Sequence, residues 1–205
     1  VSSLNSGKSE SRSVSSIFQL VYTYDSRYVL KTTVNTEGNS AMGKEKRFAN
    51  FPSFGLSWNI SEEHFLEEAT WLSDTKLRLG LGWSGNAPSG SAYYLGAYKA
   101  LGAYGNMAAI SPVRMQLDKL KWETTREFNV GFDIRLFNRF TATVDYYDKY
   151  TNDMLQSNIG ISTITGFNKL NWYNSGEMSN HGVEVRFDYE IFKNKDWAIN
   201  ANMNV

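Results

Sequence analysis

The sequence predicts an all-β protein, specifically a segment of an antiparallel, up-and-down transmembrane β-barrel. Three observations support this prediction. Apolar and polar residues alternate over long stretches, the connections between these stretches are alternately short and long, and aromatic residues gather beside the short connections. Alternation with a period of two is typical of a sheet that has one apolar and one polar face.

We expect eight strands, each defined by this alternation. The first four span residues 14–24, 27–35, 51–60 and 75–83. In the third strand, Phe54 and Leu56 alternate with small or polar residues, and in the fourth Leu77, Leu79 and Leu81 do the same. Strand length also agrees, since the apolar face of the 182–192 strand is about nine residues long, as in a tilted strand that crosses a bilayer.

The second four strands show the clearest faces, and they span residues 120–136, 139–150, 182–192 and 196–205. One face is apolar and is expected to meet lipid: Phe128, Val130, Phe132, Ile134, Val183, Val185 and Phe187. The opposite face is expected to line the lumen: Glu127, Asn129, Asp133, Arg135, Glu184 and Arg186. The cost of charge in lipid decides this assignment, because a basic side chain near the bilayer midplane costs about 2–4 kcal/mol.

The connections fall into two classes. Tight turns are expected at residues 25–26, 137–138 and 193–195, and a longer link at 61–74 has room for a turn of helix. The other connections are long, at residues 36–50, 84–119 and 151–181. Alternation of short and long connections is typical of membrane barrels, which have tight periplasmic turns and large outer loops. A soluble sandwich with Greek-key crossings is not expected to alternate short and long connections in this way.

The composition excludes several classes of protein. Basic and acidic residues number 21 each, so no net charge attracts nucleic acid. No apolar run reaches the length of a transmembrane helix. The sequence has no cysteine and only two histidines, His64 and His181. We therefore expect no disulfide, no metal site, no cofactor and no catalytic centre.

Both ends of the sequence indicate a piece of a longer polypeptide. The first residues show neither the basic region nor the apolar region of a signal peptide. The last residues, 197–205, stop within an alternating pattern. Eight strands could close a small barrel, but these ends favour a section of a larger wall.

Six stretches, taken in order, resemble a known family. They are Y-T-Y-D-S-R-Y-V-L at 22–30, R-F-A-N-F-P-S at 47–53, L-R-L-G-L-G-W-S-G-N at 77–86, L-K-W-E-T-T at 120–125, V-D-Y-Y-D-K at 144–149 and N-S-G-E-M-S-N-H-G-V-E at 174–184. Together they resemble the SusC/RagA family of TonB-dependent outer-membrane transporters, in the C-terminal part of the barrel. The resemblance covers nearly the whole chain.

This resemblance implies a barrel of about 22 strands with a plugged lumen. Residues 1–205 would be part of the barrel domain, with the N-terminal plug outside this segment. The protein would cross the bacterial outer membrane many times and would work with a SusD-like surface lipoprotein. TonB would drive import of oligosaccharides or peptides through the missing plug region. No chemistry is done on the cargo, so the resemblance implies a transporter and not an enzyme.

The long loops hold the candidates for contact with ligand or with a partner. Aromatic rings among glycine and alanine suit stacking on sugar faces or packing on a lid protein. The candidates are Tyr93, Tyr94, Tyr98, Tyr104, Trp172 and Tyr173. The alternative to energised import is a passive porin or specific channel without a plug. A membrane-embedded enzyme or adhesin is a third hypothesis, but the sequence offers no active-site residues for it.

Overall fold

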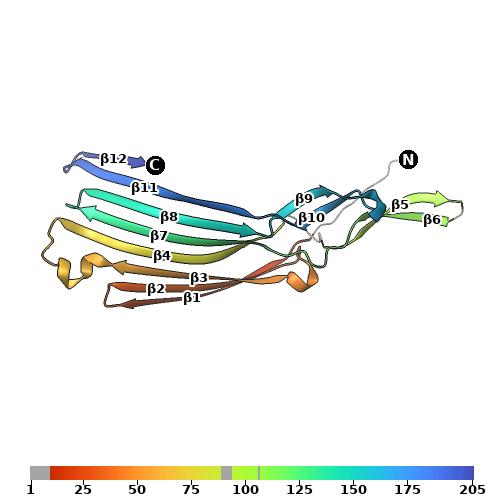
Figure 1. Ribbon diagram of the computed structural model, residues 1–205, viewed down its shortest axis with the longest axis horizontal. Coiled ribbons are helices and arrows are strands. Elements are labelled where there is room, and N and C mark those ends of the chain that lie inside the picture. Colours follow the sequence, from red (N-terminus) through yellow and green to blue (C-terminus); the bar gives the residue numbers. More distant parts are fainter. Residues whose placement is uncertain (1–9, 89–93, 106) are drawn as a thin grey trace.

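The main body is an eight-stranded antiparallel sheet, as predicted. The computed structural model describes residues 10–88, 94–105 and 107–205. The strands lie side by side in the order β1-β2-β3-β4-β7-β8-β11-β12 (Figure 1). Their bounds are β1 (Ser13–Tyr24), β2 (Tyr28–Asn39), β3 (Phe48–Asn59), β4 (Leu72–Asn86), β7 (Glu123–Leu136), β8 (Phe140–Asn152), β11 (Met178–Lys193) and β12 (Ala198–Asn204).

Two of the predicted tight turns have the two-residue geometry that suits twisted strands. Asp25 and Ser26 have φ angles of 49° and 54°, and Phe137 and Asn138 have φ angles of 53° and 55°. Positive φ at both central residues is the signature of a type I′ turn, whose twist matches that of a hairpin. A phenylalanine rarely adopts this conformation. The Phe137 N–H donates to the Trp71 carbonyl (2.8 Å), which holds the turn against the β3–β4 link.

The β3–β4 link contains the expected helical turn, in the form of two short 3₁₀ segments. These are η2 (Ile60–Glu62) and η3 (His64–Leu66). The link lies at the same end of the sheet as the tight turns (Figure 1), and we call this the tight-turn end. The opposite end, where the remaining connections gather, is the long-connection end.

The long connections differ from the prediction in two ways. Strand β2 continues to Asn39 and β3 begins at Phe48, so this connection is shorter than predicted and contains η1 (Lys44–Lys46). The other two were wrongly expected to lack strands, since each contains a hairpin. These are β5 (Ala97–Tyr104) with β6 (Met107–Arg114), and β9 (Leu155–Gly160) with β10 (Lys169–Asn174), the latter pair separated by η4 (Thr163–Thr165). Both hairpins project beyond the main sheet (Figure 1).

The strand register places apolar and polar side chains on opposite faces. Phe132 pairs with Leu77 on one side and with Val144 on the other, and Val144 pairs with Val185. We call this the apolar face. One residue away, Gly131 pairs with Arg78 and Asp145. Paired residues project to the same side of a sheet, so these residues belong to the polar face.

The sheet is a single layer, and its one cluster of buried apolar residues in the described part of the chain lies at the long-connection end. Met42 is fully buried there, and Phe51 and Trp122 meet edge to face with ring centroids 5.7 Å apart. No helix in the described part of the chain is both long and apolar enough to cross a membrane.

Candidate functional site

Arg78 is the centre of an ion-pair network on the polar face. Its Nε donates to Asp133 Oδ2 (2.7 Å), and its Nη2 donates to Asp133 Oδ1 (3.2 Å) and Asp145 Oδ2 (3.1 Å). One guanidinium from β4 thus joins carboxylates on β7 and β8. A bidentate arrangement of this kind fixes the geometry of the charges as well as their pairing.

Gly131 provides the space in which this network forms. It lies between Arg78 and Asp145 in the register, so the guanidinium must pass over it to reach Asp145. A Cβ atom at this position would lie 2.6 Å from Arg78 Cζ and would collide with Asp145 Oδ1. A larger residue here would oblige the ends of the Arg78 and Asp145 side chains to shift.

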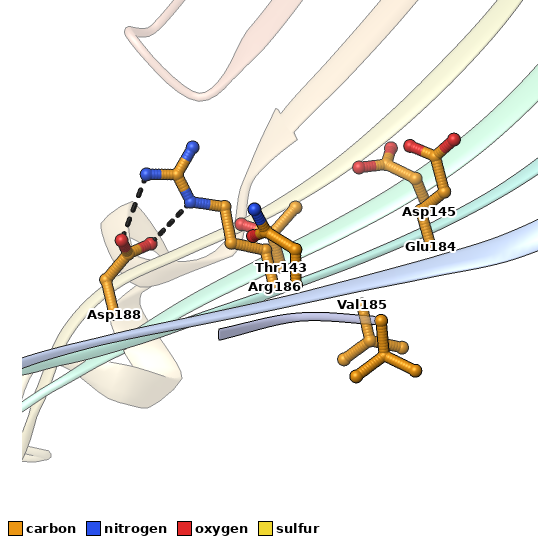
Figure 2. Close-up of a pocket in the computed structure, with 8 residues that line it drawn as sticks. Thr143, Asp145, Glu184, Val185, Arg186 and Asp188 are labelled. Carbon is orange, nitrogen blue, oxygen red and sulfur yellow. Dashed lines mark hydrogen bonds and ion pairs between the residues drawn. The ribbon is translucent and has the colours of Figure 1, made fainter. Parts of the chain in front are cut away.

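A cavity of about 700 Å³ lies on the polar face beside this network. The Glu184 and Asp145 carboxylates lie next to each other across the β8–β11 register, and Figure 2 shows them side by side. Farther along the same wall, Arg186 holds Asp188 through two hydrogen bonds of 2.8 and 2.9 Å. Val185 points to the other side of the strand (Figure 2).

The remaining residues predicted to line the lumen also occupy the polar face. Glu127 forms an ion pair with Lys149 (3.5 Å), and Arg135 Nε donates to Thr141 Oγ1 (3.4 Å). Asn129 lies between Gly80 and Tyr147 in the register. The sequence reasoning did not select Arg78, Asp145 or Lys149, although each has the polar position in its own alternating strand.

The residues predicted to face lipid share the apolar face. The register aligns Val130 with Tyr146 and Val183, and Phe132 with Val144 and Val185. Phe187 stacks on Phe140 with ring centroids 6.0 Å apart. Phe128 and Ile134 lie in the same alternating series, and large apolar side chains stay open to the surroundings across this face.

An aromatic row marks the tight-turn end of the apolar face. Tyr24 stacks on Tyr28 with centroids 6.4 Å apart, and Tyr28 stacks on Trp58 at 6.3 Å. Glu63 accepts hydrogen bonds from the Tyr28 hydroxyl (2.7 Å) and the Trp58 indole N–H (2.9 Å). These two hydrogen bonds lower the pKa of the Glu63 carboxyl, and the nearby Arg27 guanidinium lowers it further.

The long-connection end is tied together by side chains that cross between loops. Asn174 Nδ2 donates to the carbonyls of Lys121 (2.7 Å) and Asp153 (3.0 Å), while its Oδ1 accepts from the Lys121 N–H (2.9 Å). The Lys121 ammonium pairs with the Asp153 carboxylate at 2.7 Å. The Gly43 N–H donates to the Leu120 carbonyl (3.0 Å), which attaches the shorter connection to the same assembly.

The predicted loop aromatics occupy different environments. Tyr94 is only 8% exposed, because its hydroxyl accepts from Arg47 Nη2 (2.8 Å) and the guanidinium covers its ring. Tyr98 is 71% exposed on the β5–β6 hairpin. Trp172 and Tyr173 line a cavity beside residues 117–121. Tyr93 lies outside the described residues, and Tyr104 is the last residue of β5.

The polar face forms a charged wall that suits passage or docking of a polar molecule. The described part of the chain contains no group of three or more acidic, histidine or cysteine side chains placed to hold a metal ion. The carboxylates of the polar face are largely committed to ion pairs. The polar face is hydrophilic, and it continues over several neighbouring strands.

Comparison with known proteins identifies close likenesses. The family model described as TonB dependent receptor-like, beta-barrel matches residues 5–205. The TonB-dependent receptor SusC of Bacteroides thetaiotaomicron is 33% identical over 200 residues, which cover 94% of this chain and 20% of SusC. The chain therefore spans about a fifth of the length of this curated relative.

Solved structures give the same result. In the open-open state of the RagAB peptide importer, one chain matches with a TM-score of 0.85 and 30% identity, covering 95% of this chain and 21% of that chain. The siderophore receptor PirA of Acinetobacter baumannii matches with a TM-score of 0.62 at 14% identity, covering 96% of this chain and 28% of that one. At that identity the likeness concerns the fold alone.

Proposed function

The chain belongs to the family of TonB-dependent receptor-like β-barrels, and we propose that it forms part of the wall of an energised importer in the bacterial outer membrane. The importer takes up oligosaccharides or peptides and does no chemistry on them. The names of its relatives, a TonB-dependent receptor and a peptide importer, support transport over catalysis.

The contrast between the two faces of the sheet carries this proposal. The apolar face, with Phe132 and Val185, meets the acyl chains of the membrane. The polar face, with the Arg78 network, lines a wet or plugged lumen. The reverse orientation would place Arg78 and Arg186 in hydrocarbon, where each costs about 2–4 kcal/mol near the midplane. A barrel wall that crosses the membrane many times gives the apolar face contact with lipid and the polar face contact with the lumen.

The tight-turn end is assigned to the periplasm and the long-connection end to the cell exterior. Short periplasmic turns and longer outer loops are the general pattern of outer-membrane barrels. The Tyr24–Tyr28–Trp58 row fits this orientation, because amphipathic rings concentrate at the membrane interface. The Tyr28 hydroxyl and the Trp58 indole N–H reach Glu63 in the link, outside the apolar layer.

We assign two partners to the complete protein. A SusD-like surface lipoprotein covers the extracellular end, as the relationship to SusC suggests. TonB supplies the energy through the plug region, which lies outside residues 1–205. The exposed Tyr98 and Tyr173 side chains lie at the extracellular end, where they can contact cargo or the lipoprotein.

Uptake by cells that carry the full-length protein and its lipoprotein tests this function. Labelled oligosaccharides and peptides are supplied, and uptake is measured with and without a protonophore and in a strain that lacks TonB. We expect uptake of at least one class of cargo to stop in both conditions. Uptake that continues unchanged would instead establish the passive channel.

A further inference from the structure

A cavity at the extracellular end has walls from two connections that are distant in the sequence. Its volume is about 330 Å³, near the lower limit of typical ligand pockets. It lies between the segment before β7 and the base of the β9–β10 hairpin. Among its lining residues are Leu117, Lys119, Lys121, Asp153, Trp172 and Tyr173.

The walls of this cavity are held in place by hydrogen bonds. The Asn174 side chain bonds to both Lys121 and Asp153, so it joins one wall to the other. Asp153 has a φ angle of 55°, a conformation that non-glycine residues seldom adopt, and Asn174 holds its carbonyl. The Leu117 N–H donates to the Tyr94 carbonyl (2.8 Å). A site fixed in this way loses little entropy when a ligand enters.

The cavity has one cationic group in excess. Lys121 is neutralised by Asp153 at 2.7 Å. The neighbouring Asp118 is not among the residues that line the cavity, and its carboxylate accepts two hydrogen bonds of 2.8 Å from Gln116 Nε2. Lys119 is exposed, and no acidic side chain in the described ranges forms an ion pair with it. The lining therefore combines an available ammonium group with aromatic and aliphatic surface.

We propose that this cavity binds the C-terminal end of an oligopeptide whose last side chain is apolar. The Lys119 ammonium receives the terminal carboxylate, and the last side chain packs against Leu117 and Tyr173. The predominantly apolar lining suits a hydrocarbon side chain better than the hydroxyl groups of a sugar. This inference rests on the proposed import function and narrows its cargo to peptides with a free C-terminus.

Calorimetric titration of the full-length transporter with its lipoprotein tests the assignment. The probes are a pentapeptide that ends in phenylalanine and the same peptide with an amidated C-terminus. We expect the free acid to bind about tenfold more tightly, as for a hydrogen bond to a charged group. Lys119→Gln should remove this preference and Lys119→Arg should restore it. Tyr173→Ala should weaken binding of both peptides equally.

Lys44→Gln is the matched control, because Lys44 is an exposed lysine at the same end that does not line the cavity. It should leave the preference for the acid intact. Equal affinity of the wild type for acid and amide, or a preference that survives in Lys119→Gln, would overturn the proposal. Binding of trigalacturonate in place of the peptide would also overturn it. Energised uptake of other cargo by Lys119→Gln cells would show that the proposed function holds independently.

Discussion

Gly131 leaves the space in which the ion-pair network of the polar face forms. The Arg78 guanidinium occupies the space that a side chain at this position would fill, and it passes over the glycine to reach Asp145. We predict that Gly131→Ala displaces Arg78 from Asp145 and lowers the stability of the barrel by up to about 1 kcal/mol, because only the flexible ends of two side chains must shift and one partly exposed ion pair is lost. Thermal unfolding in detergent micelles, followed by the change in gel mobility on heating, measures this effect.

Gly80→Ala is the control, since Gly80 occupies a polar-face position on β4, the strand that carries Arg78. A Cβ atom there would meet only Asn129 Cβ at 3.8 Å, which is an ordinary contact. Its unfolding temperature should match that of the wild type or exceed it slightly. If the two variants unfold at the same temperature, the explanation of Gly131 is wrong.

Residue positions on each face follow from the sequence, but their partners do not. Alternation alone places Asp133 and Arg135 on the polar face. The partner of Asp133 is Arg78, which is 55 residues away, and Asp145 is 67 residues from Arg78. Such pairs depend on which strands are neighbours and on their register. A single sequence without that information leaves the pairing open.

At the scale of elements, one carboxylate attaches the β3–β4 link to the sheet through three side chains. Glu63 accepts from Tyr28 and Trp58, and it pairs with Arg27 at 3.3 Å. Because the pKa of Glu63 is lower in the folded protein, its contribution is fully present above the ordinary carboxyl value of about 4.3. It is lost as the pH falls through the lowered pKa.

We predict that the link opens more readily in acid, and that Glu63→Gln opens it at neutral pH. Amide hydrogen exchange of residues 60–71, corrected for intrinsic pH dependence, should be several-fold faster in the variant at pH 7. In the wild type it should accelerate below about pH 4. Glu68→Gln is the control, because Glu68 is exposed and outside this cluster. Equal exchange in both variants would exclude a role for Glu63 as the attachment point.

The long strands and the short ones differ in how far the sequence predicts them. The eight strands of the main sheet have long alternating patterns, because each must match an apolar layer on one side. The hairpins β5–β6 and β9–β10 lie beyond that layer, and their strands are only six to eight residues long. These strands do not have to place one face against an apolar layer. Their sequences therefore show little alternation of apolar and polar residues. Their pairing becomes visible only in the structure.

For the whole segment, stability depends on surroundings that the chain does not provide by itself. The sheet has a single layer, and its small buried apolar cluster of Met42, Phe51 and Trp122 lies at the long-connection end. Large apolar side chains elsewhere are exposed on the face assigned to lipid. On the proposed orientation, the membrane takes the place that a second layer of protein occupies in a soluble domain.

The assignment of the two faces leads to a prediction for the complete barrel. Phe132→Arg places a charge in the middle of the apolar face, between Leu77 and Val144. It should cost about 2–4 kcal/mol in the bilayer and reduce the amount of folded protein in the outer membrane. Asn129→Arg adds the same charge to the polar face of the same strand, beside Gly80. There water or polar protein can solvate it, so assembly should be close to that of the wild type. The two variants are compared by gel mobility of unboiled membrane fractions, and stronger impairment by Asn129→Arg would mean that the faces are reversed.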